Sequence, residues 1–325
     1  MTAALELAQA LRSGDRRALA KAITLVESTR AEERELAEQV LTAVSDPARR
    51  SFRVGVTGVP GAGKSTLLDV LGCHALAAGS RVAVLAVDPS SRQTGGSVLG
   101  DKTRMTRLAA EPAAFIRPSP TLGVLGGTAG RTQEVILLCE AAGYDLVFVE
   151  TVGVGQSEER VANMVDCVLL VLLAGAGDEV SSMKRGVLEA ADLIAFNKAD
   201  GEGALAANAD AASLRASLSI SRGSRVPPVL VLSALTDTGV GQLLTALTTY
   251  GAASREDGSF ELRRSAQRRA WFDSALEEGL RELFTQRPDL ALARTVAADS
   301  VADGATSASE AARRLIAELL PAVRR

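Results

Sequence analysis

One short segment constrains the fold of this chain more than any other. The residues 58-GVPGAGKS-65 follow an apolar run, 52-FRVGVTG-58, and precede a segment with apolar residues at helical spacing, 64–78. A loop of the form G-x-x-x-x-G-K-[ST] between a strand and a helix is typical of phosphate binding, because its glycines let backbone N–H groups face phosphate oxygens. The positive end of the helix dipole adds to this attraction. The sequence therefore predicts an α/β nucleotide-binding fold around this loop.

The residue types in the loop suit separate tasks. Lys64 is expected to bridge β- and γ-phosphate oxygens, and Ser65 is expected to bind Mg²⁺. His74 is the one histidine of the chain, and we expect it to be packed or on the surface rather than to act as a ligand. The predicted nucleotide-binding residues of the loop are Gly58, Gly61, Ala62, Gly63, Lys64, Ser65 and Thr66.

Short β-rich runs alternate with helical segments after residue 52. Candidate strands are 52–58, 81–88, 145–150, 167–173, 192–197 and 228–233, and candidate helices include 64–78, 131–142, 181–191 and 239–250. Continuous apolar strands separated by helices indicate a mostly parallel sheet with helices on both faces. Ligands of such sheets bind at the carboxyl ends of the strands, and every motif described below falls at one of those ends.

Helical patterns flank this α/β region. Apolar spacing before it predicts a cap of three helices, and apolar spacing after it predicts a long helix over 260–286 and a last helix over 308–320. We therefore predict an N-terminal helical extension over residues 1–50, a nucleotide-binding domain over 51–257 and a C-terminal helical arm over 258–325.

Charge and composition argue against several other classes. The net charge is −3 and no long basic block occurs, which argues against nucleic acid as a partner because phosphate neutralisation needs a cationic face. The longest apolar run, 167–177, is too short to cross a bilayer, and the N-terminus lacks a secretory signal pattern, so we expect a cytoplasmic protein with no membrane partner. Cys73, Cys139 and Cys167 are expected to be buried reduced thiols.

A second motif indicates the base of the nucleotide. The segment 196-FNKAD-200 ends a candidate strand with N-K-x-D. Asp200 can accept hydrogen bonds from guanine N1–H and its exocyclic amine, a pair of donors that adenine lacks. The stem of Lys198 can pack on the base, and Asn197 can tie this loop to the phosphate loop. A further candidate base-contacting segment after the next strand consists of Ser233, Ala234 and Leu235.

Two acidic residues end candidate strands between these motifs. Asp88 ends 81-RVAVLAVD-88, and Glu150 ends 145-DLVFVE-150 and is followed by Gly153, in the outline of a γ-phosphate-sensing motif. A parallel strand that ends in Asp between the phosphate loop and the Glu150 segment resembles the SIMIBI class of P-loop proteins. In that position Asp88 could orient the attacking water or act as a general base.

Four longer blocks resemble one family. They are 86-AVDPSSRQTGGSVLGDKTRM-105, 115-FIRPSPTLGVLGGTAGRT-132, 149-VETVGVGQSE-158 and 173-LAGAGDEVSSMKRG-186. Block by block they resemble the MeaB/MMAA/ArgK family, which are GTPases associated with methylmalonyl-CoA mutase and related adenosylcobalamin-dependent acyl-CoA mutases. The resemblance implies a G-protein chaperone that hydrolyses GTP to gate cofactor loading and protection of such a mutase. It also implies a homodimer joined through the C-terminal arm.

The same resemblance implies further site residues. Asp101 in the LGDKTRM block resembles a direct or indirect Mg²⁺ ligand, and Asp88 resembles the other acid near the metal. Glu150 would reach the metal shell, through water, with a side chain one methylene longer than that of Asp. The backbone N–H of Gly153 would sense the γ-phosphate. The implied metal ligands are Ser65, Asp88, Asp101 and Glu150.

The block 175–186 resembles a third switch that is specific to the family. In it Lys184 would pair with Asp178 in one state and approach the nucleotide in another, when a mutase docks. Ala174 replaces the usual proline, and Val-Ser-Ser-Met occupies 180–183 in place of the family's usual residues, so the client mutase is left open. The predicted catalytic residues are Lys64, Asp88, Glu150 and Lys184.

Three alternatives remain open at this point. A metal-insertion GTPase of the urease or hydrogenase accessory type would need a Cys/His cluster, and the chain has one histidine and no C-x-x-C motif. A kinase acting on a transport protein is a second alternative, against which the guanine motif argues. A nucleotide-dependent assembly scaffold without turnover is the third.

Overall fold

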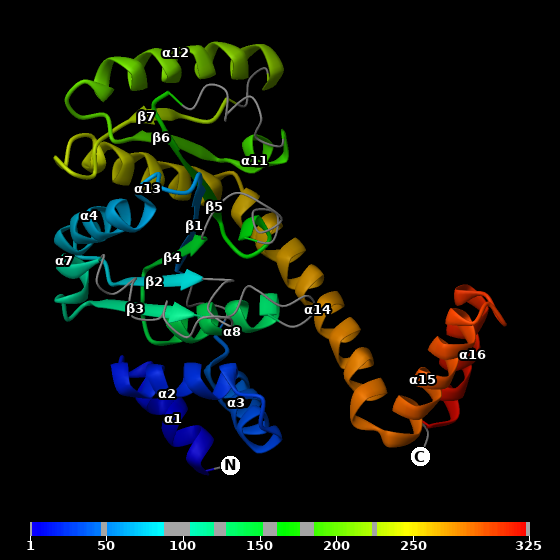
Figure 1. Cartoon of the computed structure of the whole chain (residues 1–325). Coiled ribbons are helices and arrows are strands. Elements are labelled where there is room, and N and C mark those ends of the chain that lie inside the picture. The colour runs from blue at the N-terminus through cyan, green and yellow to red at the C-terminus, as the bar shows by residue number, and fades with distance from the viewer. Residues whose placement is uncertain are drawn as a thin grey trace. The chain divides into compact units, whose positions relative to one another are not determined.

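The structure is a computed structural model, and its chain divides into two compact units (Figure 1), Met1–Arg268 and Arg269–Arg325. The described residues are 2–46, 51–87, 105–119, 128–151, 161–175, 185–222 and 226–322. The predicted domain boundaries stay predictions, since the change of unit falls inside one long helix, α14 (Ser259–Gln286).

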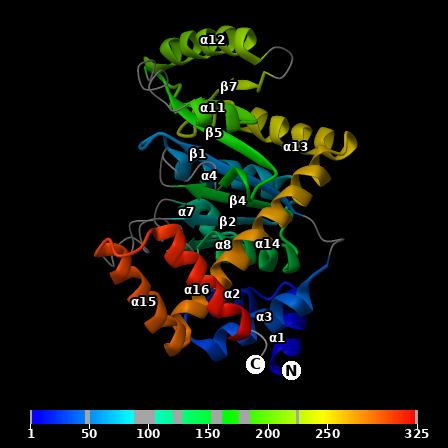
Figure 2. The ribbon, with the colours of Figure 1, turned by 90° about the vertical axis from the view of Figure 1, so that its right-hand side faces the viewer.

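The first unit is built on a seven-stranded sheet. Its strands are β1 (Phe52–Gly58), β2 (Val82–Val87), β3 (Ala114–Ser119), β4 (Leu146–Thr151), β5 (Cys167–Leu173), β6 (Leu193–Asn197) and β7 (Val229–Val231). The spatial order is β3-β2-β4-β1-β5-β6-β7, and each neighbouring pair is parallel. Figure 2 shows labelled strands in this order, from β7 at the top to β2. The predicted parallel α/β architecture is confirmed.

Helices cover both faces of this sheet. They are α4 (Lys64–Ala77), α7 (Thr106–Ala109), α8 (Thr128–Ala141), α11 (Arg185–Ala190), α12 (Gly203–Arg222) and α13 (Val240–Glu256). Successive side chains of a strand point to opposite faces. Accordingly, Phe148 of β4 packs in the core that α4 and α13 cover, while its neighbours Val147 and Val149 pack in the core that includes α8 and the N-terminal helices.

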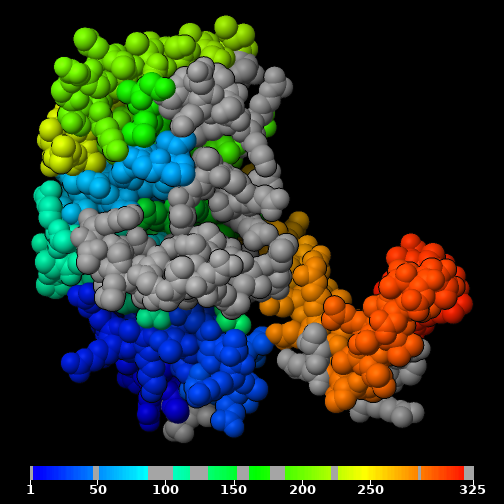
Figure 3. All heavy atoms as spheres, viewed as in Figure 1, coloured from blue at the N-terminus to red at the C-terminus, as the bar shows by residue number. Residues whose placement is uncertain are grey.

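Three helices precede the sheet, as predicted. They are α1 (Thr2–Arg12), α2 (Arg16–Glu27) and α3 (Ala31–Val44), and they lie next to β3 and α8 (Figure 1). Asp15 caps α2 by accepting hydrogen bonds from the backbone N–H groups of Arg17 (2.7 Å) and Ala18 (3.2 Å). An ion pair of 2.6 Å joins Arg117 of β3 to Glu27 of α2. Figure 3 shows the atoms of α1–α3 (blue) directly against the α/β region.

Three elements were not predicted, namely β3, the four-residue helix α7 and α15, and proline explains the omission of β3 and α15. β3 contains Pro118 and Arg117, which break the apolar pattern, but it is the outermost strand, where a missing N–H is tolerated. The long helix predicted over 260–286 stops two residues before Pro288. Pro288 begins another helix, α15 (Pro288–Ala302), because proline is well accommodated in the first turn of a helix. The last helix is α16 (Ala308–Ala322).

The three cysteines are free thiols. Cys139 and Cys167 are buried, and burial raises the pKa of both. The expectation of three buried thiols was wrong for Cys73, which is partly exposed on α4. None of the helices in the described part of the chain combines the length and apolar character needed to span a bilayer.

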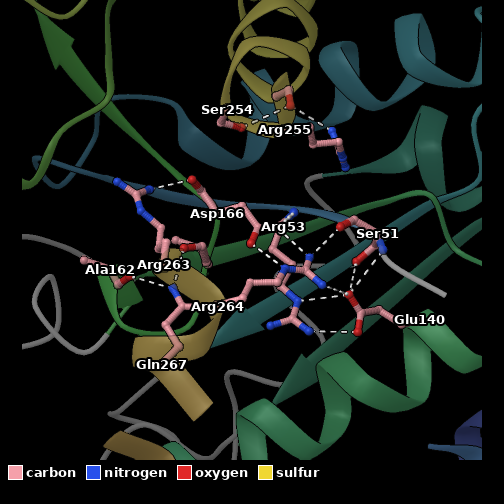
Figure 4. Close-up of polar contacts among 12 residues, drawn as sticks. Ser51, Arg53, Glu140, Ala162, Asp166, Ser254, Arg255, Arg263, Arg264 and Gln267 are labelled. Carbon is pink, nitrogen blue, oxygen red and sulfur yellow. Dashed lines mark hydrogen bonds and ion pairs between the residues drawn. The ribbon is translucent and has the colours of Figure 1, made fainter. Parts of the chain in front are cut away.

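A buried ion-pair network joins the start of α14 to the amino-terminal edge of the sheet (Figure 4). Arg264 of α14 contacts both oxygens of Asp166, with Nε–Oδ1 2.8 Å and Nη2–Oδ2 2.7 Å, and its Nη1 lies 3.1 Å from Glu140 Oε1. Arg53 of β1 contacts both oxygens of Glu140, at 3.1 and 2.8 Å. Because all four side chains are at most 6% exposed, each charge depends on its partners.

The network also includes backbone groups. Ser51 donates its N–H and hydroxyl to Glu140 Oε1 at 3.2 and 2.9 Å, and the N–H of Arg53 donates to Asp166 Oδ2 at 2.9 Å. Burial alone would raise the pKa of the Glu140 carboxyl, but the charges and hydrogen bonds of Arg53 and Arg264 hold it below its ordinary value. The first turns of α14 are therefore fixed to β1, α8 and the residue before β5.

Candidate nucleotide-binding site

The loop between β1 and α4 requires glycine at two positions by close approach. Gly58 has φ +149°, and a Cβ there would lie 2.0 Å from the carbonyl oxygen of Val171 in β5. Gly63 has φ +81°, and a Cβ there would lie 2.8 Å from Nδ2 of Asn197. The glycines thus let the loop lie against the ends of β5 and β6.

Lys64 lies over the loop that precedes it. Its Nζ donates to the carbonyl oxygens of Gly58 at 3.0 Å and Val59 at 3.2 Å, and the residue is buried. Burial lowers the pKa of the Lys64 ammonium group, whereas the charge of Glu150 raises it. An ammonium group has three donors, so two hold the side chain in place and one can be directed to a phosphate.

Ser65 and Glu150 meet at the carboxyl end of β4. The Ser65 hydroxyl donates to Glu150 Oε1 at 2.7 Å, and Glu150 is 7% exposed. Thr66, the next residue of α4, is exposed, as is Gly61. A hydroxyl and a carboxylate oxygen side by side are hard oxygen donors, which is the donor set that Mg²⁺ prefers. The residues present therefore fit a magnesium ion.

Asn197 joins three segments that are far apart in the sequence. From the end of β6 its Nδ2 donates to the carbonyl oxygen of Ala62 at 2.8 Å, and its Oδ1 accepts from the backbone N–H of Ala234 at 3.0 Å. The residue is 1% exposed. The buried Asn197 amide thus connects the phosphate loop, the N-K-x-D segment and the segment after β7. A connection between the first two of these was expected from the sequence.

Asp200 has a fixed hydrogen-bond donor of its own. The hydroxyl of Ser233 donates to Asp200 Oδ1 at 2.6 Å, and Ser233 is fully buried while Asp200 is half-buried. Lys198 is exposed with φ +60°, and the side chain of Leu235 is 80% exposed. The Ser233–Asp200 bond was not predicted, although a polar residue at the end of the neighbouring strand was a signal for it.

The other predicted site residues lie outside the described residues. They are Asp88, Asp101, Gly153 and Lys184. The described part of the site brings together Lys64, Ser65 and Glu150 on the phosphate side. It brings together Asn197, Asp200 and Ser233 on the base side. This arrangement suits a nucleotide whose phosphates lie at the amino end of α4 and whose base lies near the end of β6.

The profile of one family extends over this whole site. The family described as "Methylmalonyl Co-A mutase-associated GTPase MeaB" matches residues 19–289. The chain belongs to the MeaB family of GTPases. Escherichia coli GTPase ArgK is 46% identical to it over 271 residues, which cover 82% of each chain. The mitochondrial methylmalonic aciduria type A homolog of Mus musculus is 40% identical over 316 residues, which cover 93% of this chain and 76% of the mouse chain.

A solved structure agrees with the sequence comparisons. The crystal structure of an LAO/AO transport system kinase matches this chain with a TM-score of 0.75 at 34% identity, over 98% of both chains. The predicted MeaB/MMAA/ArgK membership and the GTPase class are confirmed by these matches.

Proposed function

We propose that this MeaB-family GTPase uses GTP hydrolysis to gate cofactor loading and protection of an adenosylcobalamin-dependent acyl-CoA mutase, such as methylmalonyl-CoA mutase. The observation that supports guanine nucleotide binding is the shared Asn197 amide, which holds the phosphate loop and the guanine-reading segment as one unit. The client rests on the description of the matched family, which names methylmalonyl-CoA mutase.

The proposed metal is Mg²⁺. Ser65 Oγ and Glu150 Oε1, 2.7 Å apart, supply oxygen donors, and we assign Asp88 and Asp101 as the further acids of the site. When bound, the ion would neutralise charge that develops on the phosphate oxygens. The buried position of Glu150 favours this role, because a carboxylate removed from water needs a donor or a cation.

The proposed reaction converts GTP and water to GDP and phosphate. The water oxygen bonds to the γ-phosphorus while the bond to the β–γ bridging oxygen breaks, and negative charge grows on the phosphate oxygens. We assign Lys64 to stabilise that charge, and the contact of its Nζ with the carbonyl oxygen of Gly58 in the phosphate loop supports this role. We assign Asp88 to orient the water and the N–H of Gly153 to contact the γ-phosphate. Lys184 would approach the nucleotide when a mutase docks on the third switch.

The decisive measurement is the GTPase rate of the full chain with and without candidate acyl-CoA mutases. We expect slow hydrolysis alone and a large rise with the client, because activating partners that complete a phosphoryl-transfer site raise turnover by about 10³–10⁵-fold. Lys64→Met should abolish the stimulated rate, and Glu33→Ala, an exposed change in the N-terminal helices, should leave it unchanged.

Other outcomes distinguish the alternatives. A rate near zero with every mutase would favour a nucleotide-dependent scaffold. Stoichiometric binding of nickel or zinc that alters GTP turnover would favour a metal-insertion GTPase. Transfer of phosphate from ATP to a protein substrate would favour a kinase.

We also assign a homodimer to this protein, formed through the second unit. On α14 an apolar stripe is formed by side chains that are exposed in the single chain, at spacings of four, four and three residues: Phe272, Leu276, Leu280 and Leu283. This spacing places them on one helix face. Such a stripe, continued by exposed Leu292 and Val296 on α15, suits a symmetric contact with a second copy.

Sedimentation equilibrium tests the dimer. The wild-type chain should sediment with the mass of two chains, and Leu276→Glu with Leu280→Glu should give one, because two buried carboxylates would lack partners in the interface. The matched control changes exposed polar positions of the same helix, Glu277→Gln and Arg281→Gln, and should remain dimeric. A wild-type monomer at micromolar concentration would contradict this assignment.

A further inference from the structure

A hydrogen-bonded pair links the helix of the phosphate loop to the segment that follows β7. His74 Nε2 and Asp237 Oδ1 lie 2.6 Å apart, with side chains 36% and 42% exposed. His74 belongs to α4, which begins at Lys64. Asp237 belongs to residues 233–238, here called the base segment. The pair therefore joins α4 to the base segment by a route that does not use Asn197.

The base segment is fixed on its inner side by groups already described. Ser233 and Thr238 exchange backbone hydrogen bonds of 2.9 and 3.0 Å, so the residues between them form a closed turn. At the base of the turn, Ser233 holds Asp200 and Ala234 holds Asn197. The orientation of the guanine-reading carboxylate thus depends on where this turn sits.

The hydrogen bond between His74 and Asp237 holds the turn from the side of α4. Asp237 has φ +59°, a left-handed conformation that Asp and Asn adopt more readily than other non-glycine residues. The His74 ring also lies close to the start of α13, because a Cβ at Gly241 would be 3.9 Å from its Cε1 and Nδ1. The hydrogen bond to His74 therefore stabilises Asp237 in this less common backbone conformation.

We propose that His74 and Asp237 are positioning residues that hold the base segment in the register required for guanine recognition. This proposal rests on the proposed role of Asp200 in reading guanine. Among the described residues, Lys64 is assigned to the phosphates and Ser65 and Glu150 to the metal, and the hydrogen bond between His74 and Asp237 involves none of these three. Loss of the pair should therefore weaken guanine binding and selectivity and should spare the hydrolysis of bound GTP.

Four variants of the full chain separate positioning from general stability. His74→Ala removes one partner. Asp237→Gly removes the other and keeps the positive φ, and the double variant removes both. Asp237→Asn keeps an acceptor oxygen and tolerates the same backbone conformation. Glu33→Ala is the matched control, because it breaks another exposed ion pair, Arg30–Glu33, in the same unit.

The measured quantities are Kd for GDP, KM and kcat for GTP, and the ratio of KM for ITP to KM for GTP. ITP lacks the exocyclic amine, so this ratio reports how well Asp200 is aligned. We expect His74→Ala, Asp237→Gly and the double variant each to weaken GDP binding by about three- to tenfold, as loss of one partly exposed charge-assisted bond should. The ITP-to-GTP ratio should fall, and kcat should stay within about twofold.

The control variants test whether the His74–Asp237 pair has a positioning role. Asp237→Asn should retain most of the wild-type affinity for GDP, and Glu33→Ala should match the wild type. The losses of GDP affinity in His74→Ala and Asp237→Gly should not add in the double variant. Unchanged GDP affinity and ITP ratio in both single variants would overturn the role of the pair, as would a loss confined to kcat. If the wild type itself does not prefer GTP over ATP, the guanine assignment fails instead, whatever the variants do.

Discussion

Replacement of Asp200 by asparagine is expected to exchange the preferred nucleotide from GTP to XTP. The carboxylate can accept from guanine N1–H and the exocyclic amine, whereas an amide would face that amine with its own N–H donor. Xanthine carries a carbonyl oxygen in place of the amine, so the asparagine amide can donate to it and accept from N1–H. Asn at this position retains an oxygen for the Ser233 hydroxyl, which now lies 2.6 Å from Asp200 Oδ1.

The expected change is large because the recognition is polar and directional. Asp200→Asn removes a charge-assisted hydrogen bond and places an N–H donor opposite the exocyclic amine of guanine. Together these changes should weaken GDP binding by about 10²–10⁴-fold. XDP binding should rise by a comparable factor, and equilibrium titration with both nucleotides measures the exchange. Glu38→Gln makes the same acid-to-amide change at an exposed site on α3 and should alter neither affinity. Unchanged GDP affinity in Asp200→Asn would contradict the guanine assignment.

Replacement of Arg264 by methionine is expected to lower the free energy of unfolding by about 3–5 kcal/mol. It removes the Arg264 guanidinium from the buried carboxylate of Asp166 and leaves that of Glu140 with Arg53. The Cζ atom of Arg264 lies 4.4 Å from the centroid of the Phe260 ring, and this cation–π contact would also be lost. The urea midpoint of the full chain measures the change. Arg30→Ala removes an exposed ion pair and should cost less than about 1 kcal/mol.

The difference in the free energy of unfolding between the wild type and Arg264→Met should decrease as the pH falls. The folded chain holds the pKa of Glu140 below its ordinary value of 4.5, so the stabilisation is present above that pH and is lost as the pH falls through the folded value. The gap between wild type and Arg264→Met should therefore narrow in acid. Equal urea midpoints at neutral pH would show that the network contributes little.

The sequence predicted the elements whose patterns are local. β1, β4, β5 and β6 are short segments rich in apolar residues. The phosphate loop and the N-K-x-D segment have fixed residue types because backbone approach and base recognition require them. Asp88, Asp101, Gly153 and Lys184 stay predictions, as no described residue tests them.

Contacts between distant polar residues could not be predicted in the same way. Arg53, Glu140, Asp166 and Arg264 come from four separate segments, and only the register of β1 against β5 and the path of α14 bring them together. His74 and Asp237 are 163 positions apart, and an isolated histidine on a helix carries no signal of its partner. Local periodicity indicates which face of an element is buried but not which charges meet there.

The single amide of Asn197 has a consequence for how a nucleotide is recognised. Since Nδ2 holds Ala62 and Oδ1 holds Ala234, a shift of either loop must disturb the other through the same planar group. We therefore expect the base and the phosphates not to bind as two independent subsites whose binding free energies add. Binding of either half of a guanine nucleotide should favour the arrangement of the loop that receives the other half.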